Sequence, residues 1–393
     1  MSAERQIVIV GAGHSGSKTA AALRKHGWTG GITLVGDEVC LPYDRPPLSK
    51  AVLLGKKTVD QCTFYPQSWY ETNNIDLRLG SAVSRIDRTK GRLVLASGSE
   101  LSYEALVLAT GSTANPLTVS GAGLANVWPL RTPDHANAIA GTLSANSRLV
   151  VIGAGVIGLE VAAAATERGC QVTVLERADH AMGRSVPSAV SDTLVAVHRT
   201  RGVEIRFGVE VSALIGDEVV RQVQLSDGQT VAADAVVYGL GVRPNVSLAA
   251  DAGLSTDNGI RTNSYLQTQD NQIYACGDVC SYDSQRYGRP VRLENWRNAE
   301  DQADTVARNL LDQRVAFDTV PWFWSNQFDL ALQVVGLPSI GIRTETQTIG
   351  NSRLFLSFDP ADTLCGASAF GTIRDIAAPL KEYKAVLACS YVS

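Results

Sequence analysis

Residues 7–16 read I-V-I-V-G-A-G-H-S-G, and residues 149–158 read L-V-V-I-G-A-G-V-I-G. Each stretch joins an apolar run, typical of a buried parallel strand, to the spacing G-x-G-x-x-G. An alanine-rich segment typical of a helix follows each one, at 17–23 and 159–165. The chain therefore carries one strand–loop–helix pattern twice.

Beyond a further glycine, both copies continue into a second apolar run, at 32–35 and 172–175. This is the β-α-β pattern in which glycines allow a tight turn and a close approach by a pyrophosphate. The unpaired N–H groups and the positive dipole end of the helix then face the phosphates. One such motif can arise by chance, but two correctly placed copies predict two dinucleotide-binding units.

Composition narrows the class of protein. The chain has 393 residues, enough for two or three domains, with 45% hydrophobic and 19% charged residues, a normal balance for a soluble globular protein. No apolar run is long enough to span a bilayer. A net charge of −4, without clustered basic and aromatic residues, argues against a nucleic-acid partner.

Localisation follows from the start of the chain and from its cysteines. The first strand-like run begins at Ile7 and leaves no room for a removable signal peptide. The seven cysteines are odd in number and include no C-x-x-C pair, which indicates reduced thiols. We therefore expect a cytoplasmic protein with no membrane partner, and we predict no metal site.

The rest of the chain shows further ordered stretches. Strands are predicted at 92–95, 103–110, 234–241 and 272–278, and a helix at 298–311. From Pro321 onward the pattern changes to short alternating strands with aromatic residues and little helix.

These break points predict an α/β fold with two Rossmann-like dinucleotide-binding domains and a C-terminal α+β domain. The second domain is expected to interrupt the first, so that the chain returns to complete it. The predicted boundaries are 1–115 and 244–320 for the first domain, 116–243 for the second and 321–393 for the third.

An ordered set of motifs resembles the FAD-dependent pyridine nucleotide–disulfide oxidoreductase superfamily. The motifs are G-A-G-H-S-G at 11–16, V-L-A-T-G at 107–111, G-A-G-V-I-G-L-E at 153–160, G-V-R-P-N at 241–245 and A-C-G-D at 275–278. The resemblance covers nearly the whole chain and implies that the first copy binds FAD and the second NAD(P)H.

Three further segments resemble a narrower group. They are L-P-Y-D-R-P-P-L-S-K at 41–50, L-E-N-W-R-N-A at 293–299 and P-W-F-W-S-N-Q-F at 321–328. They are similar to the ferredoxin and rubredoxin reductases that supply cytochromes P450 and Rieske-type oxygenases. Disulfide-reducing members of the superfamily carry a redox-active cysteine near the flavin, but residues 42–50 contain none. Cys276 and Cys280 are interpreted as buried thiols, so electrons should leave the flavin directly for an external acceptor.

The candidate FAD ligands begin with the first glycine loop, namely Gly11, Gly13, Ser15 and Gly16. An acid just past the second strand should bind the adenosine ribose, and Asp37 is our choice with Glu38 as the alternative. The resemblance adds Arg45, Val83, Thr110, Gly111, Arg131, Gly277, Asp278 and Trp296. Among these, Asp278 is expected at the ribityl chain and Trp296 under the pyrimidine end of the flavin.

Three residues are candidates for catalysis. Pro46 and Pro47 are expected to open a short helix that holds Lys50 in place. The resemblance implies that Lys50 lies next to the isoalloxazine and pairs with Glu160 near the nicotinamide, whereas a surface lysine is the plain alternative. Trp324 is expected to pack over the ring or the nicotinamide. Core packing is the alternative for this tryptophan and for Trp296.

The candidate nicotinamide-cofactor ligands begin with Gly153, Gly155, Ile157 and Gly158, with Gly241 nearby in the sequence motif. Glu176 ends the second strand, where a carboxylate binds both ribose hydroxyls of NAD and repels the extra phosphate of NADP. We therefore predict NADH over NADPH, although Arg177 and Arg184 could offset the repulsion.

The resulting hypothesis is hydride transfer from NADH to FAD, followed by single-electron transfer to a 2Fe-2S ferredoxin of the Rieske type or the plant and adrenodoxin type. The ferredoxin should dock transiently, and Arg289, Arg292 and Arg297 are candidates for steering it. One alternative is a small-molecule reductase of the monodehydroascorbate or NADH-oxidase type. Another is a redox-gated interaction protein that resembles apoptosis-inducing factor.

Overall fold

The computed structural model describes residues 5–389, which form two compact units. Unit 1 contains the described residues up to Asp44, together with Cys62–Thr113 and Arg243–Thr319. Unit 2 contains Arg45–Gln61, Ala114–Val242 and the described chain from Val320 onward. The division of the chain into three domains with the boundaries given above stays a prediction.

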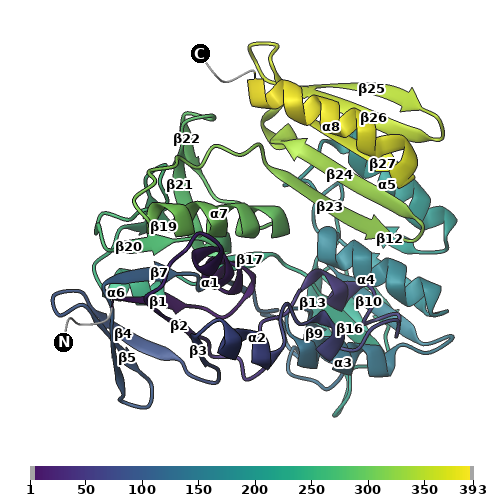
Figure 1. The fold of residues 1–393 in the computed structure, drawn as a ribbon. Coiled ribbons are helices and arrows are strands. Elements are labelled where there is room, and N and C mark those ends of the chain that lie inside the picture. Colours follow the sequence, from purple (N-terminus) through teal and green to yellow (C-terminus); the bar gives the residue numbers. More distant parts are fainter. Residues whose placement is uncertain (1–4, 390–393) are drawn as a thin grey trace. The chain divides into compact units, whose positions relative to one another are not determined.

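Unit 1 is built on a five-stranded parallel sheet of order β20-β7-β1-β2-β3 (Figure 1). Its strands are β1 (Gln6–Val10), β2 (Gly31–Val35), β3 (Ile75–Arg78), β7 (Ala105–Leu108) and β20 (Ile273–Ala275). Four of them, β1, β2, β7 and β20, are almost wholly buried, as expected for a parallel sheet covered on both faces. The strand order reverses between β1 and β7, and ligands of such sheets bind at this switch point.

Four helices belong to unit 1: α1 (His14–Lys25), α2 (Gln67–Thr72), α6 (Ser247–Asp251) and α7 (Trp296–Asn309). The helices α1 and α7 pack against each other, and Nε2 of His26 lies 2.8 Å from Oδ1 of Asp304. The helix α7 begins two residues before the predicted Asn298. The reason is that the side chain of Asn295 caps it, accepting a 2.8 Å hydrogen bond from the Asn298 N–H.

Two smaller sheets complete unit 1, the first antiparallel and the second mixed, because β19 and β21 pair in parallel. One sheet has the order β4-β5-β6 and another the order β18-β19-β21-β22. Their strands are β4 (Val83–Asp87), β5 (Arg92–Leu95), β6 (Glu100–Ser102), β18 (Thr256–Asp257), β19 (Gly259–Thr262), β21 (Cys280–Ser284) and β22 (Arg289–Val291). Short 3-10 turns lie at η2 (Asp60–Cys62) and η3 (Gly277–Val279).

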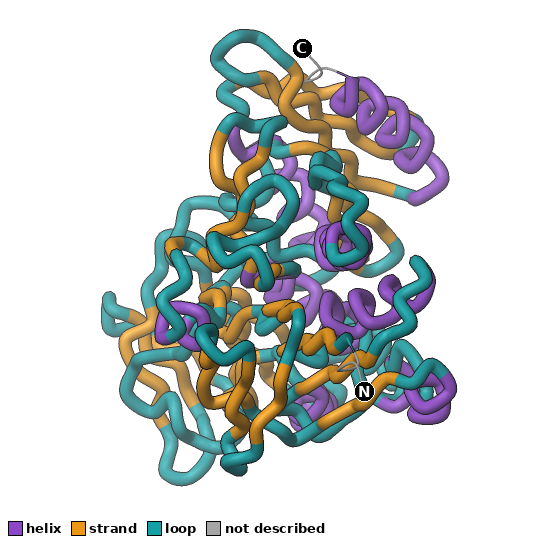
Figure 2. The backbone as a smooth tube through the Cα atoms, turned by 60° about the vertical axis from the view of Figure 1, so that its left-hand side comes forward, coloured by secondary structure: helices purple, strands orange, loops and turns teal. Residues whose placement is uncertain are grey.

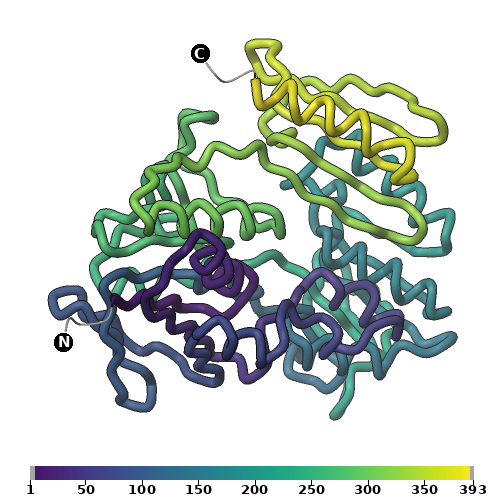
Figure 3. Tube along the Cα trace, in the orientation of Figure 1, coloured from purple at the N-terminus to yellow at the C-terminus, as the bar shows by residue number. Residues whose placement is uncertain are grey.

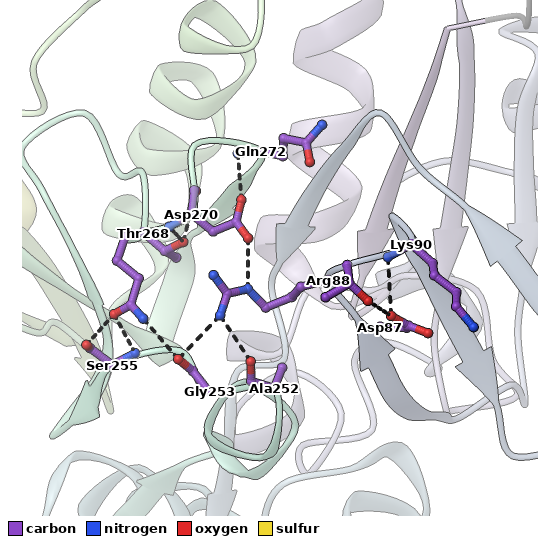
Figure 4. Close-up of polar contacts among 11 residues, drawn as sticks. Asp87, Arg88, Lys90, Ala252, Gly253, Ser255, Thr268, Asp270 and Gln272 are labelled. Atoms are coloured by element: carbon purple, nitrogen blue, oxygen red, sulfur yellow. Dashed lines mark hydrogen bonds and ion pairs between the residues drawn. The ribbon is translucent and has the colours of Figure 1, made fainter.

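Arg88, in the turn after β4, joins distant parts of unit 1 (Figure 4). Its Nε donates to Asp270 at 2.8 Å, and its Nη1 donates to the carbonyls of Ala252 at 3.2 Å and Gly253 at 3.4 Å. Asp270 accepts a further bond from the Gln272 N–H. The guanidinium therefore links three segments that are far apart in the chain.

Replacing Arg88 by Met is expected to lower the free energy of unfolding by about 2 kcal/mol, because charge-assisted bonds to a carboxylate and two carbonyls are lost. Thermal or urea unfolding of the purified protein measures the change. The matched control is Lys90→Met, since Lys90 is exposed in the same turn and bonds to Asp87 through its backbone N–H. Equal stability of the two variants would contradict a structural role for the guanidinium.

Unit 2 contains a second five-stranded parallel sheet, of order β12-β11-β10-β16-β9. Its strands are β9 (Val127–Pro129), β10 (Arg148–Ile152), β11 (Gln171–Leu175), β12 (Glu204–Arg206) and β16 (Ala235–Tyr238). The helices α3 (Pro133–Thr142), α4 (Val156–Glu167) and α5 (Ser188–Thr200) accompany it, with a small sheet of β13 (Val211–Ile215), β14 (Gln222–Leu225) and β15 (Thr230–Ala232). The two parallel sheets share one order of strands around their glycine loops, which confirms the predicted α/β class.

The rest of unit 2 is an antiparallel sheet of order β23-β24-β27-β26-β25. Its strands are β23 (Trp322–Gln327), β24 (Leu330–Gly336), β25 (Arg343–Ile349), β26 (Ser352–Phe358) and β27 (Leu364–Gly371), with a 3-10 turn at η4 (Pro338–Ile340). Figure 2 shows the helix α8 (Ile373–Cys389) alongside this sheet. The residue pattern predicted little helix here, yet Ile376, Leu380 and Leu387 form one buried face of a helix that continues through Pro379.

A segment from early in the sequence also belongs to unit 2. Figure 3 shows residues 45–61, coloured purple, beside the teal helix α4. The segment opens with the short helix η1 (Pro46–Ser49), as the proline pair predicted. The chain passes between the units in β8 (Ser112–Ala114) and near β17 (Val242–Pro244). No helix within residues 5–389 is both long and apolar enough to cross a membrane.

Candidate dinucleotide-binding and redox site

The three glycines of the first glycine loop differ in their surroundings. Gly11 has φ +109°, and a Cβ there would lie 2.1 Å from the Ala109 carbonyl oxygen. A Cβ on Gly16 would lie 1.9 Å from the Gly11 oxygen, so this glycine lets α1 approach the strand. Gly13 differs, because a Cβ there would meet nothing within 4 Å. Gly11 and Gly16 are therefore required by close backbone contacts within the fold, whereas Gly13 faces open space.

The second loop repeats this arrangement in unit 2. Gly153 has φ +102°, and a Cβ there would lie 2.5 Å from the Gly239 oxygen. A Cβ on Gly158 would lie 2.0 Å from the Gly153 oxygen, whereas one on Gly155 would meet nothing within 4 Å. The next-but-one residue, Ile157, is 39% exposed at the start of α4, unusual for an isoleucine in a nearly buried helix.

Both loops fit a pyrophosphate. Gly13 and Gly155 are the N-cap residues of α1 and α4, and neither helix start has a side-chain cap. The first N–H groups of each helix therefore keep their capacity to bind an anion, which the helix dipole also attracts. Ser15, at the start of α1, donates from its Oγ to the Ala299 carbonyl at 3.2 Å, and its role toward the pyrophosphate stays a prediction.

The remaining unit 1 candidates lie after the carboxyl ends of the parallel strands. Asp37 follows β2, Thr110 follows β7 and Gly277 follows β20, while Val83 starts β4 at the sheet beside them. Asp37 is exposed; the alternative, Glu38, accepts a 2.8 Å bond from the Tyr43 hydroxyl. Asp37 is thus the acid whose side chain faces solvent.

Three hydrogen bonds in two residue pairs secure the strand ends of unit 1. Thr110 Oγ1 donates to the Asn245 carbonyl at 2.8 Å, and Asn245 Nδ2 donates back to the Thr110 carbonyl at 2.8 Å. Ser112 Oγ donates to Asp278 at 2.7 Å. Gly111, with φ +65°, lies between these contacts. Asn245 and Ser112 received no role from the sequence, although both lie in or beside motifs quoted above.

Trp296, at the start of α7, is half-buried. Its indole Nε1 donates to Asp44 at 2.7 Å, and the ring meets His14 edge-on with centroids 4.8 Å apart. Asp44 is another residue that the sequence did not single out, although it lies inside the proline-rich motif. Its hydrogen bond orients the indole ring.

Lys50 and Glu160 form a buried ion pair in unit 2. Lys50 Nζ lies 2.6 Å from Glu160 Oε2, and the glutamate side chain is only 2% exposed. Glu160 also accepts hydrogen bonds from Ser49, the last residue of η1, and from Ser325 at 2.6 Å. The structure thus pairs the two residues that the resemblance paired, and it makes the surface-lysine alternative wrong. Ser49 and Ser325 are additional contacts.

Arg45 and Arg131 also meet in unit 2, where Arg45 Nη1 donates to the Arg131 carbonyl at 2.7 Å. Trp324 lies on β23, half-buried and stacked on Trp322 with ring centroids 5.1 Å apart. An aromatic surface of two indoles therefore accompanies the ion pair in the same unit.

Glu176, just after β11, is hydrogen-bonded through its side chain to the second glycine loop. Its Oε2 accepts from the Ala154 N–H at 2.7 Å and its Oε1 from the Ala178 N–H at 2.8 Å. A carboxylate has further lone pairs, so ribose hydroxyls can still bind. Arg177 and Arg184 are exposed; the Arg184 guanidinium lies against Gly241, where a Cβ would be 2.5 Å from Nη2.

No disulfide joins the cysteines within residues 5–389. Cys276 and Cys280 are buried, and burial raises the pKa of the Cys276 thiol and raises that of Cys280 to about 12. Thiols held protonated in this way are poor nucleophiles. This agrees with their interpretation as buried thiols.

Comparison with known proteins decides the family. Residues 5–303 match the family described as pyridine nucleotide-disulphide oxidoreductase. The chain belongs to this family. Rhodocoxin reductase of Rhodococcus erythropolis is 42% identical to this pyridine nucleotide-disulphide oxidoreductase over 84% of the chain and 78% of the relative.

Two further similarities are close. The ferredoxin–NAD(+) reductase component of the p-cumate 2,3-dioxygenase system of Pseudomonas putida is 41% identical over 86% of this chain and 83% of its own. The crystal structure of the covalent putidaredoxin reductase–putidaredoxin complex matches this oxidoreductase with a TM-score of 0.93 and 36% identity, covering 98% of this chain and 93% of that chain.

Proposed function

We propose that this chain is an NADH-dependent ferredoxin reductase that uses bound FAD to pass electrons to a 2Fe-2S ferredoxin serving an oxygenase. The observation that carries the proposal is the similarity, over 98% of the chain, to a putidaredoxin reductase solved in a covalent complex with putidaredoxin. The two open glycine loops and the buried lysine–glutamate pair support it, because they supply the binding sites and a charged group for the redox step.

In this proposal FAD is held by unit 1. The N–H groups at the start of α1 bind its pyrophosphate across the open face of Gly13. Asp37 binds the adenosine ribose, and Asp278, held by Ser112, binds the ribityl chain. The FAD-binding domain then comprises 1–115 and 244–320.

NADH is held by unit 2, in a domain covering 116–243. Its pyrophosphate lies at the start of α4 beside Gly155, and Glu176 accepts from the ribose hydroxyls. The carboxylate of Glu176 disfavours a 2′-phosphate at the same place, which supports NADH over NADPH. Arg177 and Arg184 are exposed and remain the residues that could offset this repulsion.

Glu176→Ala is expected to raise the Michaelis constant for NADH about tenfold, because a charge-assisted contact to the ribose is lost. The Michaelis constant for NADPH should rise less. Steady-state kinetics with each coenzyme measures both constants. The matched control is Glu204→Ala, since Glu204 is an exposed acid on the adjacent strand β12. Equal effects on the two coenzymes would remove Glu176 from the ribose site.

When bound, FAD supplies the ability to take up two electrons as hydride and to release them one at a time. The protein supplies position and charge. The ammonium of Lys50, oriented by Glu160, offers a hydrogen bond and a positive charge to the ring that becomes electron-rich. Trp324, which stacks on Trp322, is proposed to pack over the flavin ring or the nicotinamide.

Anaerobic mixing of the purified yellow protein with NADH, followed by a 2Fe-2S ferredoxin, tests the proposal. We expect flavin absorbance to bleach and then to return quickly as the ferredoxin is reduced. Bleaching that persists with several ferredoxins would reject the ferredoxin partner. Ascorbate radical and oxygen would then be tried as small-molecule acceptors, and a long-lived charge-transfer complex without turnover would indicate a redox-gated interaction protein.

A further inference from the structure

A chain of buried polar side chains runs from the lysine–glutamate pair into the interior of unit 2. Ser325 and Gln327 lie on β23 and are 0% and 2% exposed, and His198 of α5 is 0% exposed. Ser325 has appeared so far only as a contact of Glu160, and Gln327 and His198 have no role in the site as described. Buried polar groups are costly unless they are hydrogen-bonded, so their arrangement needs a reason.

The hydrogen bonds that join His198, Gln327, Ser325 and Glu160 can run in only one direction. Ser325 Oγ lies 2.6 Å from Glu160 Oε1, and because a carboxylate only accepts, the hydroxyl donates its single proton there. The hydroxyl oxygen is then the acceptor for Gln327 Nε2 at 3.0 Å. Each donor therefore points toward Glu160.

The same argument fixes the orientation of the Gln327 amide and the ring nitrogen of His198 that carries the proton. With its nitrogen directed at Ser325, Gln327 presents Oε1 to His198 Nε2, 2.7 Å away. An amide oxygen cannot donate, so His198 Nε2 carries a proton. Burial lowers the pKa of His198, which favours the neutral ring, and Nδ1 has no hydrogen-bond partner among the described residues. Phe328 packs edge-on against the ring, with centroids 5.0 Å apart.

Glu160 thus divides its donors between its two oxygens. Oε2 accepts hydrogen bonds from Ser49 and Lys50, and Oε1 accepts one from Ser325. Because the side chain is 2% exposed, water has little access to replace a lost donor. A carboxylate bonded on both oxygens cannot rotate, and so the direction of the Lys50 ammonium is set as well.

We propose that Ser325, Gln327 and His198 are positioning residues that hold the Glu160 carboxylate, and through it the Lys50 ammonium, in the geometry used for flavin reduction. The proposal rests on the proposed function only in that Lys50 and Glu160 serve the step in which NADH reduces FAD. It does not depend on the identity of the electron acceptor.

The test uses FAD-loaded protein and anaerobic stopped-flow bleaching by NADH, without ferredoxin, over a range of NADH concentrations. We expect Ser325→Ala to lower the limiting rate about tenfold and Gln327→Met to lower it about threefold, with little change in the apparent Kd for NADH. The matched control is Asn326→Ala, which lies between them on β23 with an exposed side chain and should react as wild type. Ser325→Thr restores the hydroxyl and should recover most of the rate.

A second readout needs no turnover. In protein labelled with ¹⁵N-histidine, the NMR shifts of His198 should show a neutral ring with the proton on Nε2, and Ser325→Ala should move these signals. A His198 proton on Nδ1, or wild-type limiting rates in both Ser325→Ala and Gln327→Met, would overturn the proposal. Failure of the ferredoxin-reductase function would appear separately, as wild-type protein that bleaches with NADH but reduces no ferredoxin.

Discussion

Lys50→Met is expected to slow flavin reduction by NADH about 100-fold while FAD stays bound, because it removes a fixed positive charge worth several kcal/mol in a dry site. Stopped-flow bleaching measures the rate, and flavin absorbance per protein measures FAD content. Lys50 reaches Glu160 at 2.6 Å and is 20% exposed, so solvent replaces its charge poorly.

Stability must be separated from chemistry in this variant. Removing one partner of a buried pair leaves the other unpaired and costs about 3–5 kcal/mol. The double variant Lys50→Met/Glu160→Leu removes both charges, and we expect it to regain stability without regaining the rate. Lys56→Met is the matched control, because Lys56 is 67% exposed and lies 3.9 Å from Glu167. A double variant that reduced its flavin at the wild-type rate would demote Lys50 to a structural residue.

Gly13→Ala is expected to yield folded protein that has lost most of its FAD. The added Cβ meets nothing within 4 Å, and the backbone of Gly13 is extended, with φ −78° and ψ −162°, so the fold accepts alanine. The methyl group would occupy the space proposed for the pyrophosphate, and we expect FAD affinity to fall at least about tenfold. Flavin absorbance after gel filtration measures retention.

The second loop supplies the matched comparison. Gly155→Ala should keep its FAD and raise the apparent Kd for NADH by about the same factor, because Gly155 has the same open surroundings. Gly141→Ala, in helix α3, should change neither cofactor. Gly11→Ala should fail to fold, since its Cβ would lie 2.1 Å from a carbonyl oxygen. Loss of NADH binding in Gly13→Ala together with full FAD content would reverse our assignment of the two loops.

Local patterns predicted much of this molecule. The two glycine loops, their strands and helices, and the short helix opened by Pro46 depend on contacts between residues close in the chain. Such contacts are readable from spacing and residue type. The helix α8 was underestimated because Pro379 normally argues against a helix interior, while the buried face of Ile376, Leu380 and Leu387 favours one.

The residues that secure the site were harder to predict. Asn245 reaches back to Thr110 across 135 positions, and Ser325 reaches Glu160 across 165. No periodicity connects residues so far apart. Their partners depend on which strands become neighbours in a sheet and which helix packs on them.

The amino-acid pattern alone was sufficient for two dinucleotide-binding units, because the constraints on a glycine turn, its strand and its helix are local steric ones. Only the tertiary structure showed that Glu160 is held by Ser49, Lys50 and Ser325. It also showed that Gln327 is hydrogen-bonded to Ser325, and His198 to Gln327. The physical reason is that hydrogen bonds and ion pairs between distant segments form only after hydrophobic packing has brought those segments together and excluded water.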